Sequence, residues 1–149
     1  MGLDVYLINK KYIGANYEHN KITGKIELFQ DGKLININLD RVIYIEEEIG
    51  SWRKANAIHN WFVDNVQDGK DNCEYHYVSD EKLEELLNIV NQILNDHDLA
   101  EELLPTQNGF FFGSTDYDEW YFEDLKDTKE ILEKALKEEY GDIYYLSSW

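Results

Sequence analysis

The chain has 149 residues, of which 43% are hydrophobic and 14% aromatic, so it can bury one core and is too apolar for a disordered tail. Its thirty-one acidic and fourteen basic residues give a net charge of −17, which opposes direct binding to nucleic acids and to anionic membranes. Cys73 is the only cysteine, which excludes an intrachain disulfide and a cysteine-rich zinc site and favours a reducing cytosol.

The sequence contains no segment typical of export or membrane insertion. No stretch approaches the roughly 20 apolar residues that a membrane span needs. Neither a repeat nor a Pro/Ser-rich linker divides the chain. We therefore expect a single cytoplasmic domain over residues 1–149, with an oligomeric state that the sequence leaves open.

Alternating apolar residues predict strands in the N-terminal third. Residues 3–8 alternate as a strand with at least one buried face. Residues 41–45 form a β-branched and aromatic run, which we expect Glu46 to Glu48 to end before Gly50.

A hairpin is predicted between these two strands. Residues 25–30 and 33–38 both alternate between apolar and polar side chains. They flank Asp31-Gly32, a dipeptide that favours a two-residue type I′ turn.

The apolar period then changes to that of helices. A first helix is expected from Ser51 as N-cap to about residue 67, and a second begins after Ser79. Residues 99–104 add a turn before Pro105. The second helix has an apolar stripe of Leu83, Leu86, Leu87, Val90, Ile93 and Leu94.

The last third is predicted to hold a strand, a helix and a final strand. Residues 109–113, GFFFG, are most simply a buried strand. A third helix runs from Asp118 or Asp124 to Tyr140, with Gly141 as its stop, and residues 143–146 form the last strand.

The element order indicates an α+β fold, in which N-terminal antiparallel strands and a hairpin pack with about three helices in a two-layer single domain. The side chains expected in its core are Leu3, Val5, Leu7, Phe62, Leu86, Leu87, Val90, Phe111, Leu132 and Leu136.

The first candidate site block is residues 52–62, which contain the only adjacent Arg-Lys pair. On the predicted helix, Trp52, Asn56 and His59 share one stripe, and Arg53 lies at the helix N-terminus. Guanidinium and free N–H groups there suit an anion. The alternative is structural: Trp52 and His59 lie in the core, and the cations pair with the glutamates before them.

The second block is residues 103–121, where polar groups follow the predicted aromatic strand. Its candidate ligand-binding residues are Phe112, Ser114, Tyr117 and Asp118, because loops held by a rigid scaffold often carry function. The alternative is a strand followed by a helix N-cap at residues 114–116. We predict that both blocks line one cleft, with Trp52, Arg53, Asn56 and His59 facing the four residues of the second block.

Other chemistry has weak support in the sequence. Asp116, Asp118 and Glu119 are close together, but an acidic chain brings carboxylates together by chance. The four histidines lack metal-ligand spacing, and no phosphate-binding glycine motif is present. We expect no metal and no cofactor. Cys73 shows no sign of activation.

Three segments, MGLDVYL, WRKANAIHNWFV and AEELLPTQNGFFFGSTDYDEWYFEDL, resemble a family of small uncharacterised proteins of tailed bacteriophages and prophages. The resemblance spans the N-terminus and most of residues 40–149, while Val5 stands where we expect methionine. It implies a setting, an accessory phage protein inside a bacterium, and transfers no activity, cofactor or catalytic residue.

Three functions remain open. The first is a non-enzymatic binding protein for a small anionic or nucleotide-like ligand, with the blunting of a host defence signal as one such role. The second is an inhibitor of a host protein or a nucleic-acid mimic, since residues 96–149 hold fifteen acidic and four basic residues. The third is an enzyme in which His59 works with Asp116 or Asp118.

Overall fold

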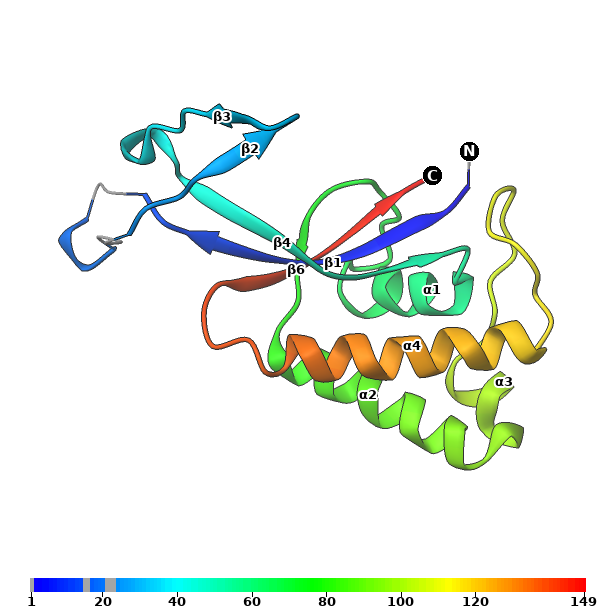
Figure 1. Cartoon of the computed structure of the whole chain (residues 1–149). Coiled ribbons are helices and arrows are strands. Elements are labelled where there is room, and N and C mark those ends of the chain that lie inside the picture. The colour runs from blue at the N-terminus through cyan, green and yellow to red at the C-terminus, as the bar shows by residue number, and fades with distance from the viewer. Residues whose placement is uncertain (1, 15–16, 21–23) are drawn as a thin grey trace.

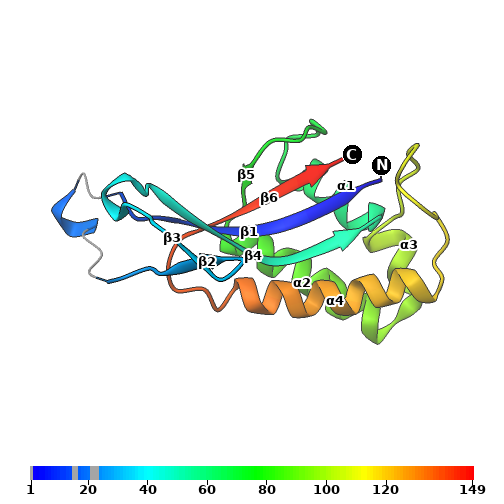
Figure 2. The ribbon, with the colours of Figure 1, turned by 45° about the horizontal axis from the view of Figure 1, so that its top comes forward.

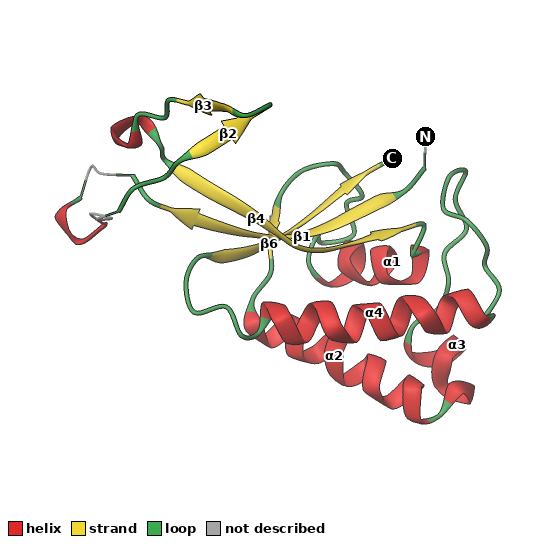
Figure 3. Cartoon of the chain, viewed as in Figure 1, coloured by secondary structure: helices red, strands yellow, loops and turns green. Residues whose placement is uncertain are grey.

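Four antiparallel strands form a sheet in the order β4-β1-β6-β5, and helices cover one of its faces (Figures 1 and 3). The computed structural model describes residues 2–14, 17–20 and 24–149. The strands of the sheet are β1 (Asp4–Tyr12), β4 (Tyr44–Arg53), β5 (His76–Tyr77) and β6 (Asp142–Ser148). The helices are α1 (Asn56–Asn65), α2 (Asp80–Asn95), α3 (Ala100–Leu103) and α4 (Glu119–Ala135). The α+β prediction is thereby confirmed.

The central strand β1 follows the predicted alternation. Leu3, Val5 and Leu7 have no exposed surface and join the hydrophobic core on the helix side of the sheet. Tyr145 of β6 pairs with Leu7 and stacks on Phe62 of α1, with ring centroids 4.1 Å apart. The sheet and α1 therefore share one apolar layer.

Strand β4 is longer than predicted, and this moves the start of the first helix. The three glutamates do not end the strand, which continues through Gly50 to Arg53. Hence Ser51 is not an N-cap and Trp52 is not helical, so both predictions are wrong. Gly50 is needed because a Cβ at this position would overlap the Ile131 side chain of α4. The glycine allows close approach of strand and helix and does not break the strand.

Helix α2 agrees with the prediction at its start and along its apolar stripe. The Ser79 side chain caps it by accepting a hydrogen bond from the Lys82 N–H. Leu83, Leu86 and Val90 are fully buried, and α2 packs along α4 (Figure 2).

The predicted hairpin forms but stays outside the core. Strands β2 (Leu28–Gln30) and β3 (Lys33–Ile35) pair around Asp31 and Gly32, whose φ angles of 50° and 74° fit a type I′ turn. All six strand residues are exposed. The hairpin is a separate two-stranded sheet that projects from the far end of β1 and β4 (Figure 1).

Two predictions for the last third are wrong. Residues 109–113 form no strand but a turn in the loop before α4, where Phe110 is 93% exposed. Helix α4 begins after Asp118, the first of the two predicted starts, and Asp118 itself is the N-cap, so a cap at residues 114–116 is wrong. The helix ends at Ala135, so Tyr140 is exposed and Gly141 is no helix stop.

Seven of the ten expected core residues are fully buried, whereas Leu87, Phe111 and Leu136 are only partly buried. Leu87 and Leu136 pack at the edge of the core, and Phe111 belongs to the loop. Within the described ranges, no helix has the length and apolar character needed to cross a membrane.

Candidate functional site

Asn56 joins the two candidate blocks. Its Nδ2 donates hydrogen bonds to the backbone oxygens of Phe112 (2.9 Å) and Ser114 (2.8 Å), and its Oδ1 accepts one from the Gln107 N–H (2.9 Å). The side chain is only 4% exposed. This single amide therefore fixes the 105–118 loop over the N-terminus of α1.

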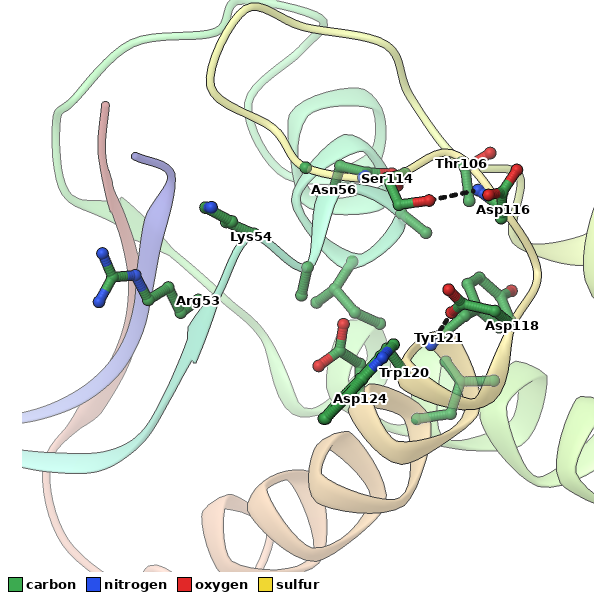
Figure 4. A pocket seen from close by; sticks show the side chains of 15 residues that line it. Arg53, Lys54, Asn56, Thr106, Ser114, Asp116, Asp118, Trp120, Tyr121 and Asp124 are labelled. Carbon is green, nitrogen blue, oxygen red and sulfur yellow. Dashed lines mark hydrogen bonds between the residues drawn. The ribbon is translucent and has the colours of Figure 1, made fainter. Parts of the chain in front are cut away.

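A pocket of about 280 Å³ lies where the blocks meet, between the end of β4, the start of α1, the loop and the first turns of α4 (Figure 4). This volume is near the lower limit of roughly 300–1,000 Å³ for small-molecule sites. The polar residues that line it are Arg53, Lys54, Asn56, Thr106, Ser114, Asp116, Asp118, Trp120, Tyr121 and Asp124.

One wall of the pocket is the first turn of α1. Ala55 is the N-cap and offers no side-chain hydrogen bond. In the described part of the chain, the N–H groups of Ala57 and Ile58 have no hydrogen-bond acceptor, and both residues border the pocket although they are buried. Free N–H groups at a helix N-terminus attract anions.

The chain turns into α1 through a strained residue. Lys54 has a φ of 60°, a conformation that is costly for a lysine. Its N–H donates to the Leu3 oxygen (2.7 Å), and its oxygen accepts from the Asn56 N–H across an inverse γ-turn. Gly113 packs against it, since a Cβ there would lie 3.1 Å from the Lys54 Cβ. This left-handed backbone conformation brings Lys54 to the edge of the pocket.

The two cations lie on the side of the pocket opposite Asp116 and Asp118 (Figure 4). Arg53 is 3.9 Å from the Asp4 carboxylate and is largely exposed. Lys54 forms no ion pair with any residue that the structure describes. Neither cation pairs with Glu46 to Glu48. Glu46 instead contacts Lys10 and Glu47 contacts Lys11, both from β1.

Carboxylates and an indole form the other wall. Asp118 caps α4 by accepting a hydrogen bond from the Tyr121 N–H (3.1 Å). Trp120 is 78% exposed. Burial, together with the negative charges of Asp127 and Asp118, raises the pKa of Asp124 to about 6. A carboxyl group that changes charge near neutral pH and lies in a pocket is typical of functional sites.

His59 is not part of the pocket, contrary to prediction. It is 1% exposed, and its Nδ1 lies 2.6 Å from the Tyr145 hydroxyl. Its Nε2 is 3.2 Å from Asp71 Oδ2, without a well-aligned hydrogen bond. The Phe112 ring closes over its edge. The histidine contacts neither Asp116 nor Asp118, so the proposed acid–base pair is not assembled.

Three other predicted residues lie behind the pocket wall. Trp52 is buried and donates from Nε1 to the Thr128 hydroxyl (2.8 Å). Tyr117 accepts a hydrogen bond from the Thr106 N–H and packs against Tyr121. Phe112 is the third, and its ring packs against His59. Trp52, Tyr117 and Phe112 therefore support the pocket walls from behind.

The structure thus brings Arg53, Asn56, Ser114 and Asp118 together, as predicted, and leaves the other four predicted residues outside. Sequence reasoning missed Lys54, Trp120 and Asp124. The signal for the last two was their i, i+4 spacing on α4, which places both on one side of the helix.

Within the described residues, no group of three or more His, Cys, Asp or Glu side chains is placed to hold a metal ion. Comparisons with protein-family models, with curated proteins and with solved structures gave no match.

Proposed function

We propose that the protein is a non-enzymatic binding protein whose pocket takes a small nucleotide-like ligand. The observation that carries the proposal is the division of the pocket into a cationic, N–H-rich side and a side with carboxylates and an exposed indole. A nucleotide has the matching halves, because its phosphate is anionic while its base is flat and carries N–H donors.

The phosphate half fits the start of α1. The Ala57 and Ile58 N–H groups point out of the first helical turn, and Lys54 has no competing ion pair in the described chain. Backbone N–H groups at a helix N-terminus hold phosphate by hydrogen bonds and by the helix dipole.

The base half fits α4 and its cap. The exposed face of Trp120 offers a stacking surface, and Asp116 is an exposed carboxylate that accepts hydrogen bonds from an exocyclic amine. A simple anion fits less well, because Asp116, Asp118 and Asp124 oppose it.

The resemblance to phage proteins adds a setting to this proposal. In the cytosol of an infected bacterium, a protein that sequesters a nucleotide-like signal would act as an antagonist of host defence. Such a role requires binding alone.

Isothermal titration calorimetry with the four ribonucleoside 5′-monophosphates tests the proposal, with inorganic phosphate and the free nucleosides as part-ligands. At least one monophosphate should bind more tightly than either of its parts. Lys54→Gln should weaken the binding of that monophosphate about tenfold, equivalent to ~1.4 kcal/mol, and should leave the affinity for the nucleoside unchanged.

The matched control is Lys33→Gln, which removes the same charge from the exposed hairpin. Failure of every monophosphate to bind, or equal weakening by both lysine variants, would reject the phosphate site. Small molecules released from protein purified out of a bacterial host, identified by mass spectrometry, would name the natural ligand.

A further inference from the structure

The open face of the sheet carries a row of five tyrosines, of which Tyr144 is half-buried and the others are exposed. Val5 and Leu7 of β1 face the helices, so the alternate residues of this strand face the other way. Cross-strand partners share a face of the sheet. The tyrosines on the side away from the helices are therefore Tyr12, Tyr44, Tyr77 and Tyr144. Tyr75 precedes β5 and joins them through its contact with Tyr144.

These rings form one connected surface. Ring centroids are 5.3 Å apart for Tyr12 and Tyr44, 6.2 Å for Tyr75 and Tyr144, and 6.0 Å for Tyr77 and Tyr144. Lys10 bridges the two groups, because its Nζ lies 4.4 Å from the Tyr44 ring centre and 5.1 Å from that of Tyr75. We call these five tyrosines and Lys10 the tyrosine ladder.

The ladder is exposed and bordered by carboxylates. Tyr44, Tyr75 and Tyr77 are 49%, 45% and 58% exposed. Glu46 accepts a hydrogen bond from the Tyr75 hydroxyl and pairs with Lys10, and Glu48 lies next to it on the same face. Exposed tyrosines are enriched at protein interfaces, because they bury a large area at low cost in conformational entropy.

We propose that the tyrosine ladder is a docking face for a basic segment of a partner protein. Arginine and lysine side chains stack on tyrosine rings, and Lys10 of this chain already occupies two of them in that manner. The neighbouring carboxylates and the net charge of −17 attract the same cations.

Charge argues against other occupants. A second copy would bring another −17 to the interface, and nucleic acids and anionic lipids would bring phosphates. The hairpin that projects beside β4 is different, since residues 13–43 contain four acidic and four basic residues. Its exposed Leu28, Phe29 and Leu34 supply a neutral apolar border for the same partner.

The test uses a short fluorescent peptide of alternating arginine and leucine, with a glutamate-for-arginine peptide as the charge-reversed probe. The arginine peptide should bind the wild-type protein and the glutamate peptide should not. The double variant Tyr75→Ala/Tyr77→Ala should weaken binding at least about fivefold, while Tyr75→Phe/Tyr77→Phe retains it.

The control is Tyr140→Ala, which removes a still more exposed tyrosine that lies outside the ladder and should not change the affinity. Nuclear Overhauser effects between arginine methylenes of the peptide and tyrosine rings of the wild-type protein test the same contact without any variant. Their absence, or unchanged affinity of the double alanine variant, would overturn the proposal. A dimer that buries the ladder in sedimentation experiments, or preferential binding of single-stranded RNA, would also overturn it.

Discussion

Buried polar side chains hold the frame of the pocket at fixed positions. Asn56 satisfies three backbone groups of the loop and its neighbours, and His59 is tied to Tyr145 beneath them. Such networks are costly to break, because a buried donor or acceptor left without a partner loses its solvation and gains nothing in return.

Tyr145→Phe should therefore lower the free energy of unfolding by about 1–3 kcal/mol, because it leaves His59 Nδ1 buried without its hydroxyl partner. Urea denaturation measures the change. Tyr144→Phe is the matched control on the open face of the sheet and should be nearly neutral. Equal stability of the two variants would mean that the buried hydrogen bond contributes nothing.

The raised pKa of Asp124 predicts a dependence of stability on pH. Because the folded-state pKa, about 6, exceeds the ordinary aspartate pKa of 3.8, the native state binds this proton more tightly than the unfolded state. This group therefore destabilises the fold as pH rises from about 4 to about 6, and its full cost remains above that range.

Asp124→Asn should accordingly stabilise the protein at pH 8 and leave its stability unchanged at pH 4. We expect about 1 kcal/mol at pH 8, since solvent screens this partly exposed group. Thermal denaturation at both pH values measures it, with Glu130→Gln on the exposed side of α4 as control. A gain that is the same at both pH values would contradict the assigned pKa.

At the level of elements, local patterns predicted most of the fold, and the errors occur where tertiary contacts override them. The alternation of β1, the Asp31-Gly32 turn and the Ser79 cap depend on neighbours in sequence, and all three are confirmed. The conformations of Gly50 and of the GFFFG run depend on contacts with segments far away in the chain, and the predictions for both were wrong.

In the candidate site, too, local patterns predicted one part correctly and distant contacts determined the rest. The convergence of the two blocks was predicted because polar groups gather at the ends of apolar elements. Which side chains face the pocket depends on the start of α1, and the error at Ser51 placed Trp52 and His59 on the wrong surface. The Asn56 bridge arises from a loop whose path no local pattern specifies.

The close approach of β4 to α4 gives a prediction at this scale. Gly50→Ala should destabilise the protein by about 1–3 kcal/mol, because the new Cβ overlaps Ile131 in a packed core. Gly24→Ala meets no atom within 4 Å and should be far milder. Chemical denaturation of the two variants measures the difference. Ile131→Ala should cost less in the Gly50→Ala background than in the wild type, because it removes all three side-chain carbons that the new Cβ would meet.

Over the whole molecule, thirty-one acidic residues outnumber fourteen basic ones, whereas the hairpin region, residues 13–43, is balanced with four of each. The net charge of −17 excludes phosphates from most surfaces, so the N–H groups and cations of the pocket must act at short range. A single phosphate held by a helix N-terminus is compatible with this field, whereas a polyanion is not.

Duplex DNA should consequently show no binding at about 150 mM salt. Fluorescence anisotropy with a labelled duplex measures this, and a nucleoside monophosphate that binds the pocket serves as the positive control. Micromolar DNA affinity under these conditions would show that the charge argument fails.

The most direct measurement of the central claim is a ¹⁵N NMR titration of the protein with the tightest-binding nucleoside monophosphate. We expect the largest shifts at the Ala57 and Ile58 amides and at the Trp120 indole N–H, because these residues line the two sides of one pocket. Saturating shifts confined to another surface, or no shift at these three groups, would show that the nucleotide does not bind in this pocket.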